Sequence, residues 1–168
     1  LIKDIFKVTR GNVLAVEKVS TKRNKENPYP VYSSQTLNKG LLGYYSEYLY
    51  DTAITWTTDG ANAGTVNFRN GKFYSTNVNG VLLSTEGYAN KAVAESLNLI
   101  AWKYVSKVGN PKLMNNIMSE ISIKLSKDMS ELKLLSDFFI MCDEKIEVEE
   151  KKLEKLKKMK EAFLEEMF

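Results

Sequence analysis

Short segments in which hydrophobic and polar residues alternate occupy much of the first half of the chain. They run over residues 29–33, 54–57, 65–69, 72–75 and 77–83 and are rich in β-branched and aromatic residues. This pattern is typical of β-strands. Asn70-Gly71 separates two of the segments and predicts a two-residue hairpin turn between them. We therefore expect a sheet of short strands in this part of the chain.

Apolar residues change to helical spacing between residues 89 and 108, and Gly109-Asn110-Pro111 favours an end to this helix. The face expected to be buried carries Val93, Leu97, Ile100, Ala101 and Tyr104. A further short helix is predicted over residues 114–118, followed by a last alternating strand over residues 121–125. Strands followed by helices predict a small mixed domain of the α+β class.

The last part of the chain carries a heptad pattern. One seam of positions advances in alternating steps of four and three residues: Leu135, Phe139, Cys142, Ile146, Glu149, Leu153, Leu156, Lys160, Phe163 and Met167. Such a repeat is typical of a coiled-coil helix, and the two charged positions favour one register. A helix of about 38 residues is roughly 57 Å long, more than a domain of this size can cover. The seam therefore predicts pairing with a second helix.

Composition and charge change at the same place. All glycines, tyrosines and tryptophans precede residue 125, and no Gly, Pro, Tyr or Trp follows it. Residues 1–124 carry fifteen Lys/Arg against nine Asp/Glu, whereas residues 125–168 carry nine against twelve. We therefore divide the chain into a domain, residues 1–124, and a long C-terminal coiled-coil α-helix, residues 125–168. The basic excess of the domain is compatible with a polyanionic partner but does not require one.

The residue types needed for most catalytic sites are missing from the sequence. There is no histidine, and Cys142 is the single cysteine, which excludes His-based triads, His metal sites and thiolate zinc sites. No P-loop or G-x-G-x-x-G motif is present. Asp51 and Asp59 have no further acids nearby, and Asp59-Gly60 is more typical of a turn. We expect no catalysis, no cofactor, no metal and, without a long apolar run, no membrane span.

Two polar stretches carry a resemblance to a known family. The first runs over residues 29–36 (YPVYSSQT), followed by Asn38-Lys39-Gly40 and Gly43-Tyr44. The second runs over residues 54–66 (ITWTTDGANAGTV), followed by Arg69, Gly71-Lys72-Phe73 and Thr76-Asn77-Val78. Together they closely resemble a target recognition domain of the specificity subunit of type I restriction–modification systems.

The C-terminal helix is similar to the conserved spacer helix of the same family. Residues 121–125 lead into a long, Lys-rich helix that ends in Met167-Phe168. The chain departs from the family pattern at the start of this helix. Ser126-Lys127 and Glu131-Leu132 stand where the family usually has a proline and then Glu-Gln. We therefore expect the start of the helix to differ in geometry from that of the family.

The resemblance implies a non-catalytic subunit that binds one half of a bipartite double-stranded DNA target. Methyltransferase (modification) and nuclease (restriction) subunits, which hold the chemistry, would dock on it. Family members usually carry two recognition domains and two spacer helices, and this chain has one of each. We therefore expect a half-length subunit or a fragment, a homodimer formed through the C-terminal helix, and a place in the cytoplasm.

The residues expected to contact DNA are polar side chains that can reach base edges or phosphates. They are Ser34, Gln35, Asn38, Lys39, Thr58, Asn62, Arg69, Lys72, Tyr74 and Asn77. Each of them could equally hold a turn of the scaffold. Two other interpretations of the whole chain stay open. One is a coiled-coil protein-interaction adaptor that does not bind DNA, and the other is a fragment of a catalytic DNA methyltransferase, which the missing cofactor motif disfavours.

Overall fold

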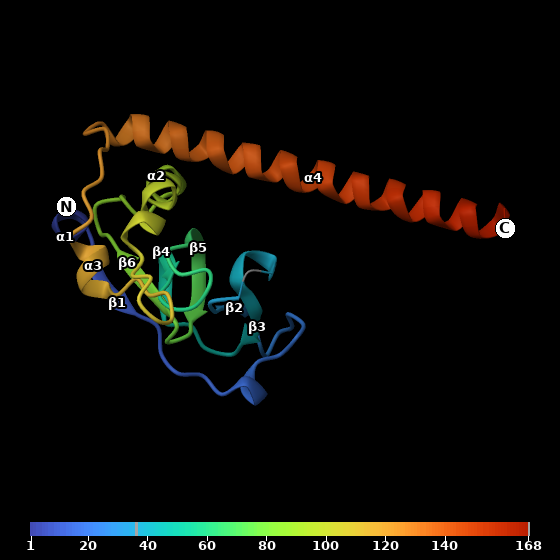
Figure 1. The fold of residues 1–168 in the computed structure, drawn as a ribbon, viewed down its shortest axis with the longest axis horizontal. Helices are drawn as coiled ribbons and strands as arrows, with labels where there is room; N and C mark the ends of the chain where they lie inside the picture. The colour runs from blue at the N-terminus through green and yellow to red at the C-terminus, as the bar shows by residue number, and fades with distance from the viewer. Residues whose placement is uncertain (36, 168) are drawn as a thin grey trace.

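The computed structural model describes residues 1–35 and 37–167, which form a mixed sheet with helices packed on it and one long helix projecting from it (Figure 1). The strands are β1 (Lys7–Arg10), β2 (Tyr29–Tyr32), β3 (Leu41–Tyr45), β4 (Tyr50–Thr57), β5 (Val66–Ser75) and β6 (Asn79–Leu83). They lie in the order β1-β6-β4-β5-β2-β3, and all neighbours are antiparallel except β2 and β5. The predicted α+β class is confirmed.

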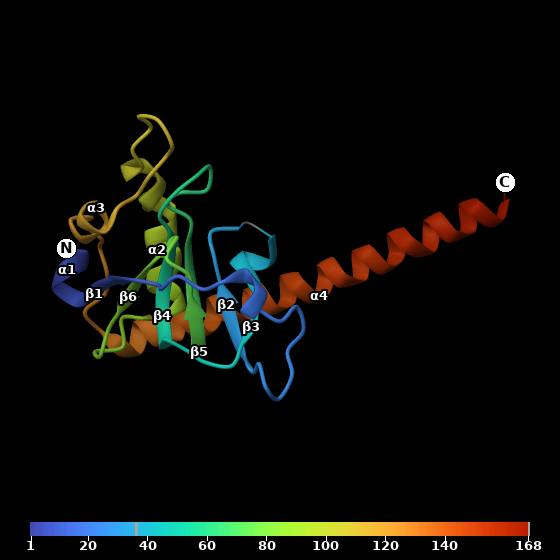
Figure 2. The ribbon, with the colours of Figure 1, turned by 90° about the horizontal axis from the view of Figure 1, so that it is seen from below.

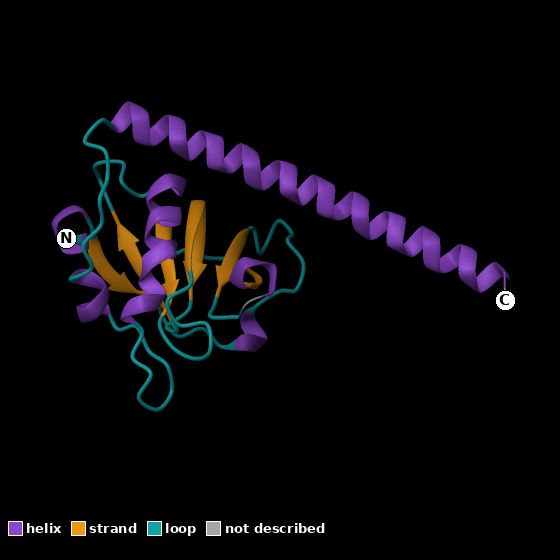
Figure 3. Cartoon of the chain, turned by 45° about the horizontal axis from the view of Figure 1, so that its top comes forward, coloured by secondary structure: helices purple, strands orange, loops and turns teal. Residues whose placement is uncertain are grey.

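The helices fall into short ones and one very long one (Figure 3). The α-helices are α1 (Ile2–Ile5), α2 (Lys91–Ala101), α3 (Asn115–Ser119) and α4 (Met129–Met167), and the 3-10 helices are η1 (Val16–Lys18), η2 (Leu37–Gly40) and η3 (Trp102–Tyr104). The first turns of α4 run alongside α2, and the rest extends well past the sheet (Figures 1 and 2). The expected long C-terminal helix is therefore present.

The core lies mainly between the sheet and α2. Val93 and Leu97 of α2 are fully buried against the face of the sheet that carries Ile54, Trp56 and Leu82. The alternate residues of the same strands point to the opposite face, where Ala53, Phe73 and Val81 form a second, smaller cluster. Both faces of the central strands are thus covered, which explains why β4 is buried almost continuously from Ala53 to Thr57.

Trp56 fixes the packing of the two central strands. Its indole is 1% exposed and its Nε1 donates to the carbonyl oxygen of Leu113 at 2.9 Å. Gly80 pairs with Trp56 from β6, and the indole occupies the space that a side chain at position 80 would need. A Cβ built at position 80 would come within 2.1 Å of the Trp56 ring. This close approach allows the largest core side chain to lie flat against the neighbouring strand.

The hairpin predicted at Asn70-Gly71 is wrong. Residues 65–69 and 72–75 do not pair with each other; Val66–Ser75 form the one strand β5, which pairs with β4. The register shifts between Asp51 and Ala53, which marks a β-bulge. Gly71 has φ +74° and its N–H donates to Thr52 Oγ1 at 3.1 Å. The glycine therefore serves the left-handed conformation of a bulge rather than of a turn.

Three other boundaries differ from those predicted. Residues 121–125 form no strand: their alternating apolar side chains pack inward, but the segment pairs in no ladder. The helix expected to reach residue 108 ends at Ala101 and continues only as η3, so Tyr104 is 43% exposed. The strand expected from residue 77 begins at Asn79 because residues 77 and 78 form the turn after β5.

The N-terminus of α2 is capped by Asn90. Its Oδ1 accepts the N–H of Val93 at 3.0 Å. Replacing Asn90 with Ala leaves that N–H without its partner, so we expect the free energy of unfolding to fall by about 1 kcal/mol. Urea denaturation followed by circular dichroism measures this change. Asn90→Asp is the control because an aspartate also caps, and it should keep most of the stability.

Candidate nucleic-acid interface

Several polar loops meet at one end of the sheet (Figure 2). The loops of residues 33–40 and 58–65 line one hollow together. Residues 58–65 also contact the loop of residues 105–112 through the Asp59–Lys112 bridge, and Thr58 N–H donates to the carbonyl oxygen of Val78 at 3.1 Å in the turn before β6. Asp59 accepts the hydroxyl of Thr58 at 2.7 Å and thus holds the turn. Segments distant in sequence form a single loop surface here.

The first two loops enclose a hollow of about 210 Å³. Its lining is almost entirely polar: Ser33, Gln35, Lys39, Gly40, Thr57, Asn62, Thr65 and Asn67. Hydroxyl and amide groups both donate and accept hydrogen bonds, which suits the mixed donors and acceptors on the edges of bases. The lysine adds the positive charge that phosphates attract. These residue types are compatible with a nucleic-acid interface.

The turn that carries Lys39 has an unusual backbone. Asn38, Lys39 and Gly40 have φ of +51°, +53° and +86°. A left-handed conformation costs roughly 1–2 kcal/mol for a residue such as lysine, so neighbouring contacts must hold it. Arg69 Nη2 donates to the Lys39 carbonyl oxygen at 2.7 Å, and Ser33 N–H donates to that of Gly40 at 2.9 Å. Gln35 Nε2 also donates to the carbonyl oxygen of Leu41.

Arg69 is a buried cation beneath this turn. Its side chain is 5% exposed, its Nε donates to Thr55 Oγ1 at 3.0 Å, and its guanidinium lies 3.7 Å from the ring centroid of Tyr32. Burial lowers the pKa of Arg69 to about 10, still far above neutrality, so the side chain stays charged. Within residues 1–35 and 37–167 it makes no ion pair. Its charge adds to the positive potential under the loops.

The structure separates the residues expected to contact DNA into three groups. Gln35, Asn38 and Lys39 are exposed on one loop, with Ser34 half-buried beside them; Asn62 is half-buried across the hollow, and Asn77 is exposed in the turn after β5. These residues form one surface. Thr58, Arg69 and Tyr74 are instead 0%, 5% and 7% exposed and bond to the scaffold, which favours a structural role, and their contact with DNA stays a prediction.

Lys72 lies apart from this surface. It pairs with Asp51 at the start of β4, and its Nζ lies 4.6 Å from the ring centroid of Tyr48. Because β2 and β5 are parallel, Lys72 is near the start of β2, whereas the loop of residues 33–40 follows the end of β2. Lys72 and Arg69 belong to one motif in the sequence. In the structure Lys72 lies near the start of β2, whereas Arg69 lies beneath the turn that carries Lys39.

Sequence reasoning missed other parts of the surface. Ser33, Thr65 and Asn67 line the hollow, and each lies within three residues of a predicted DNA contact. Exposed lysines also occur on the adjoining loop, at Lys107 and Lys112. Another basic loop, with Lys22, Arg23 and Lys25, precedes β2 and therefore lies at the opposite end of this strand from the hollow. Basic residues clustered between predicted elements were the signal available for these loops.

The seam of α4 is largely uncovered. Leu132 and Ser136 on the neighbouring face are buried against the domain, and Phe139 and Cys142 are half-buried. From Glu144 to Met167 every residue is exposed. Ile146, Leu153, Leu156 and Phe163 are each more than half exposed, which is unfavourable for large apolar side chains in one row.

The described part of the chain contains neither a metal-ligand cluster nor a membrane-spanning helix. No three His, Cys, Asp or Glu side chains gather there in a way that could hold a metal ion. None of its helices is both long enough and apolar enough to cross a membrane.

Comparison with known proteins identifies the family. The family model for the type I restriction modification DNA specificity domain matches residues 1–158. The chain belongs to this family. A Mycoplasma pneumoniae protein named as the N-terminus of a type I specificity subunit is 38% identical over 136 residues, which cover 79% of this chain and 71% of that protein. The type I restriction enzyme MpnII specificity subunit from the same organism is 32% identical over 152 residues.

Solved specificity subunits share the fold. The S subunit of a type I restriction–modification system from M. genitalium matches with a TM-score of 0.69 at 15% identity, and the HsdS subunit from Thermoanaerobacter tengcongensis with 0.59 at 10%. The chain covers only 38% and 37% of these two proteins, and 45% of the MpnII subunit. This DNA specificity domain is therefore similar to one part of larger relatives, and the resemblance inferred from the two polar motifs is confirmed.

Proposed function

We propose that this DNA specificity domain binds one half of a bipartite duplex target and takes no part in catalysis itself. The observation that carries the proposal is the loop surface around the polar hollow, with its fixed left-handed turn and the buried charge of Arg69 beneath it. Exposed Gln35, Asn38, Lys39 and Asn77, with Ser34 and Asn62, are the proposed DNA contacts. Base-specific recognition needs such rigidly presented donors and acceptors.

We propose residues 1–124 as the recognition domain and residues 125–168 as the spacer helix on which modification and restriction subunits dock. Such a reader works in the cytoplasm of a bacterium, where the duplex is found. An adaptor without DNA binding is not favoured, because the family match covers both the loops and the helix. The type I relatives are named as specificity subunits, which leaves the chemistry to other subunits.

Pairing of two copies through α4 is part of the proposal. The seam has the same spacing from either end, with residue 151 at its centre, so an antiparallel partner places Ile146 opposite Leu156 and Phe139 opposite Phe163. Charge supports the same direction. Residues 137–150 carry six Asp/Glu and one Lys, whereas residues 151–160 carry six Lys and one Glu. An antiparallel pair brings each block against its opposite, whereas parallel copies in register would set like charges together.

This arrangement predicts the form of the DNA target. An α4 of 39 residues is about 58 Å long, so two identical domains would lie roughly one and a half turns of duplex apart, at 34–36 Å per turn. We expect selection from a random duplex library to enrich a symmetric site: two short half-sites separated by unread base pairs. Enrichment of one continuous site would contradict the paired arrangement. Failure to enrich any sequence would contradict the proposed function.

A further inference from the structure

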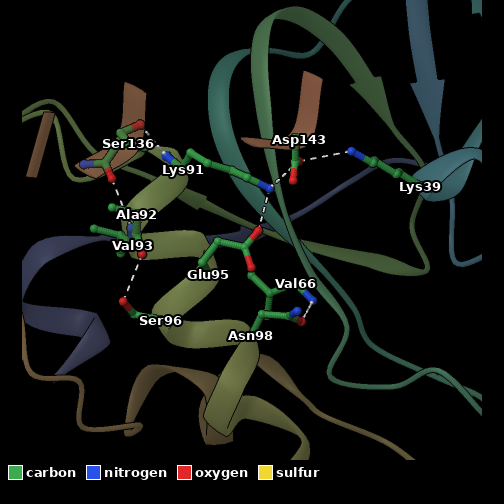
Figure 4. Close-up of polar contacts among 11 residues, drawn as sticks. Lys39, Val66, Lys91, Ala92, Val93, Glu95, Ser96, Asn98, Ser136 and Asp143 are labelled. Atoms are coloured by element: carbon green, nitrogen blue, oxygen red, sulfur yellow. Dashed lines mark hydrogen bonds and ion pairs between the residues drawn. The ribbon is translucent and has the colours of Figure 1, made fainter. Parts of the chain in front are cut away.

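The carboxylate of Asp143 on α4 bonds to the loop that carries Lys39 (Figure 4). Asp143 of α4 lies 3.1 Å from Lys39 Nζ and 2.8 Å from Lys91 Nζ, both measured at its Oδ2. Lys91 also pairs with Glu95 on α2, at 2.5 Å. Three segments that are far apart in the sequence, the η2 turn, α2 and α4, thus share one ionic cluster.

The two lysines on Asp143 are bound very differently. Lys91 contacts α4 through both its backbone and its side chain. Its Nζ pairs with Asp143, and its backbone N–H donates to Ser136 Oγ at 3.0 Å, seven residues before Asp143 on the same face of α4. Its side chain is 15% exposed. Burial opposes its charge, but hydrogen bonds to Asp143 and Glu95 raise the pKa of Lys91 above its usual value. This contact belongs to the packing of α4 on α2.

Lys39 is held firmly through its backbone, whereas its ammonium group makes only an exposed ion pair. Arg69 fixes its carbonyl oxygen, whereas its side chain is 69% exposed and its ion pair with Asp143 connects two surface groups. An exposed ion pair is weak and exchanges readily. The ammonium can therefore change partners while the left-handed turn stays in place. Asp143 would keep Lys91 as its partner after such an exchange, so no carboxylate would be left unpaired.

We propose that Asp143 is a positioning residue that holds the Lys39 ammonium in the DNA-free protein and releases it to a backbone phosphate when duplex binds. This inference rests on the proposed function. A phosphate is the stronger competitor because duplex binding also releases counterions. Asp143 lies between the seam positions Cys142 and Ile146. Binding at the loop would therefore alter the charge on the flank of the helix that pairs the two copies.

A double-mutant cycle on the full chain tests the exchange. The four proteins are wild type, Asp143→Asn, Lys39→Ala and the double variant, and the probe is a random-sequence duplex across a salt series. Asp143→Asn removes the competing carboxylate, so we expect binding to tighten about two- to fivefold, the range that an exposed ion pair supports. In the Lys39→Ala background the same change should have little effect. Lys39→Ala itself should flatten the salt slope by about one unit.

Glu150→Gln is the matched control, because Glu150 lines the same groove beside Lys39 without bonding to it. General loss of negative charge would tighten binding as much in this variant and in both Lys39 backgrounds, and that result would overturn the inference alone. Absence of duplex binding by all of the proteins would overturn the proposed function together with the inference.

A second measurement needs no variant. Amine acylation read by mass spectrometry should show Lys39 protected when random duplex is bound. Without duplex, Lys39 should be modified more slowly than the exposed amine of Lys107, which makes no ion pair with the described residues. Lys91 should remain unmodified in both states because α4 covers it. Duplex that binds but leaves Lys39 as reactive as before would refute the transfer to a phosphate.

Discussion

Replacing Ile146 and Leu153 with Asp should convert the proposed dimer into a monomer. Both side chains are seam positions and are 55% and 52% exposed in the single chain, so they lack a covering partner. In a coiled coil each would insert between four residues of the facing helix. A carboxylate there must lose its water without gaining a partner, which costs several kcal/mol at each site in each copy. Light scattering should report one 19.1 kDa chain in place of two.

Val148→Asp is the matched control for this experiment. Val148 is 50% exposed, lies on the same helix between the two seam residues, and takes no part in the seam. The control adds one such carboxylate outside the seam, so a pairing that uses the seam should survive it. A wild-type chain that is monomeric at micromolar concentration would contradict the proposed dimer. Dissociation of the Val148→Asp protein as well would show that another face of α4 makes the contact.

The long helix and the central elements of the domain were predictable from local pattern. The heptad spacing after residue 125 predicted α4 because no Gly or Pro interrupts it. Ile54 and Trp56 predicted a strand where β4 lies, and the spacing of Val93 and Leu97 predicted a helix where α2 lies. In each case a run of residues repeats one period for long enough to specify the element without its neighbours.

The incorrect secondary-structure predictions concern segments whose structure depends on contacts with residues distant in the sequence. Asn-Gly suits a hairpin turn and a bulge equally, since both need a residue with positive φ. Two contacts favour the bulge in this protein: Thr52 accepts the Gly71 N–H, and Asp51 pairs with Lys72. The short strands β1 and β3 were not predicted for the same reason. Each has at most five residues and is defined by its partner strand rather than by its own pattern.

The candidate site was predictable as a set of loops but not residue by residue. The two motifs fall on the loops of residues 33–40 and 58–65, which the structure brings together around one hollow. They could not separate Lys39, whose side chain is exposed, from Arg69, whose side chain lies beneath the same turn. Arginine is rarely buried without a carboxylate, so composition favoured an exposed role. Its actual partners are a backbone oxygen, the Thr55 hydroxyl and the Tyr32 ring.

Arg69→Ala should therefore weaken the fold before it weakens any single base contact. The change removes the donor to the Lys39 carbonyl oxygen and the donor to Thr55, and it leaves a void under Tyr32. Two lost hydrogen bonds and the lost packing together should lower the free energy of unfolding by about 3 kcal/mol. Urea denaturation measures this loss. Cognate DNA binding should fall toward the level of random duplex at the same time, because the left-handed turn that presents Lys39 is no longer held.

The Arg69→Met variant distinguishes a structural role of Arg69 from a direct contact with a base. Methionine restores packing against Tyr32 and removes a buried charge, so it should recover part of the stability, but it cannot hold the Lys39 carbonyl oxygen. We expect this variant to fold and still to read its target poorly. The alternative, in which Arg69 contacts a base, predicts a loss of roughly 1–3 kcal/mol on cognate DNA with stability unchanged. An Arg69→Ala protein as stable as wild type would support that alternative, because a guanidinium that holds the turn cannot be removed without destabilising the turn.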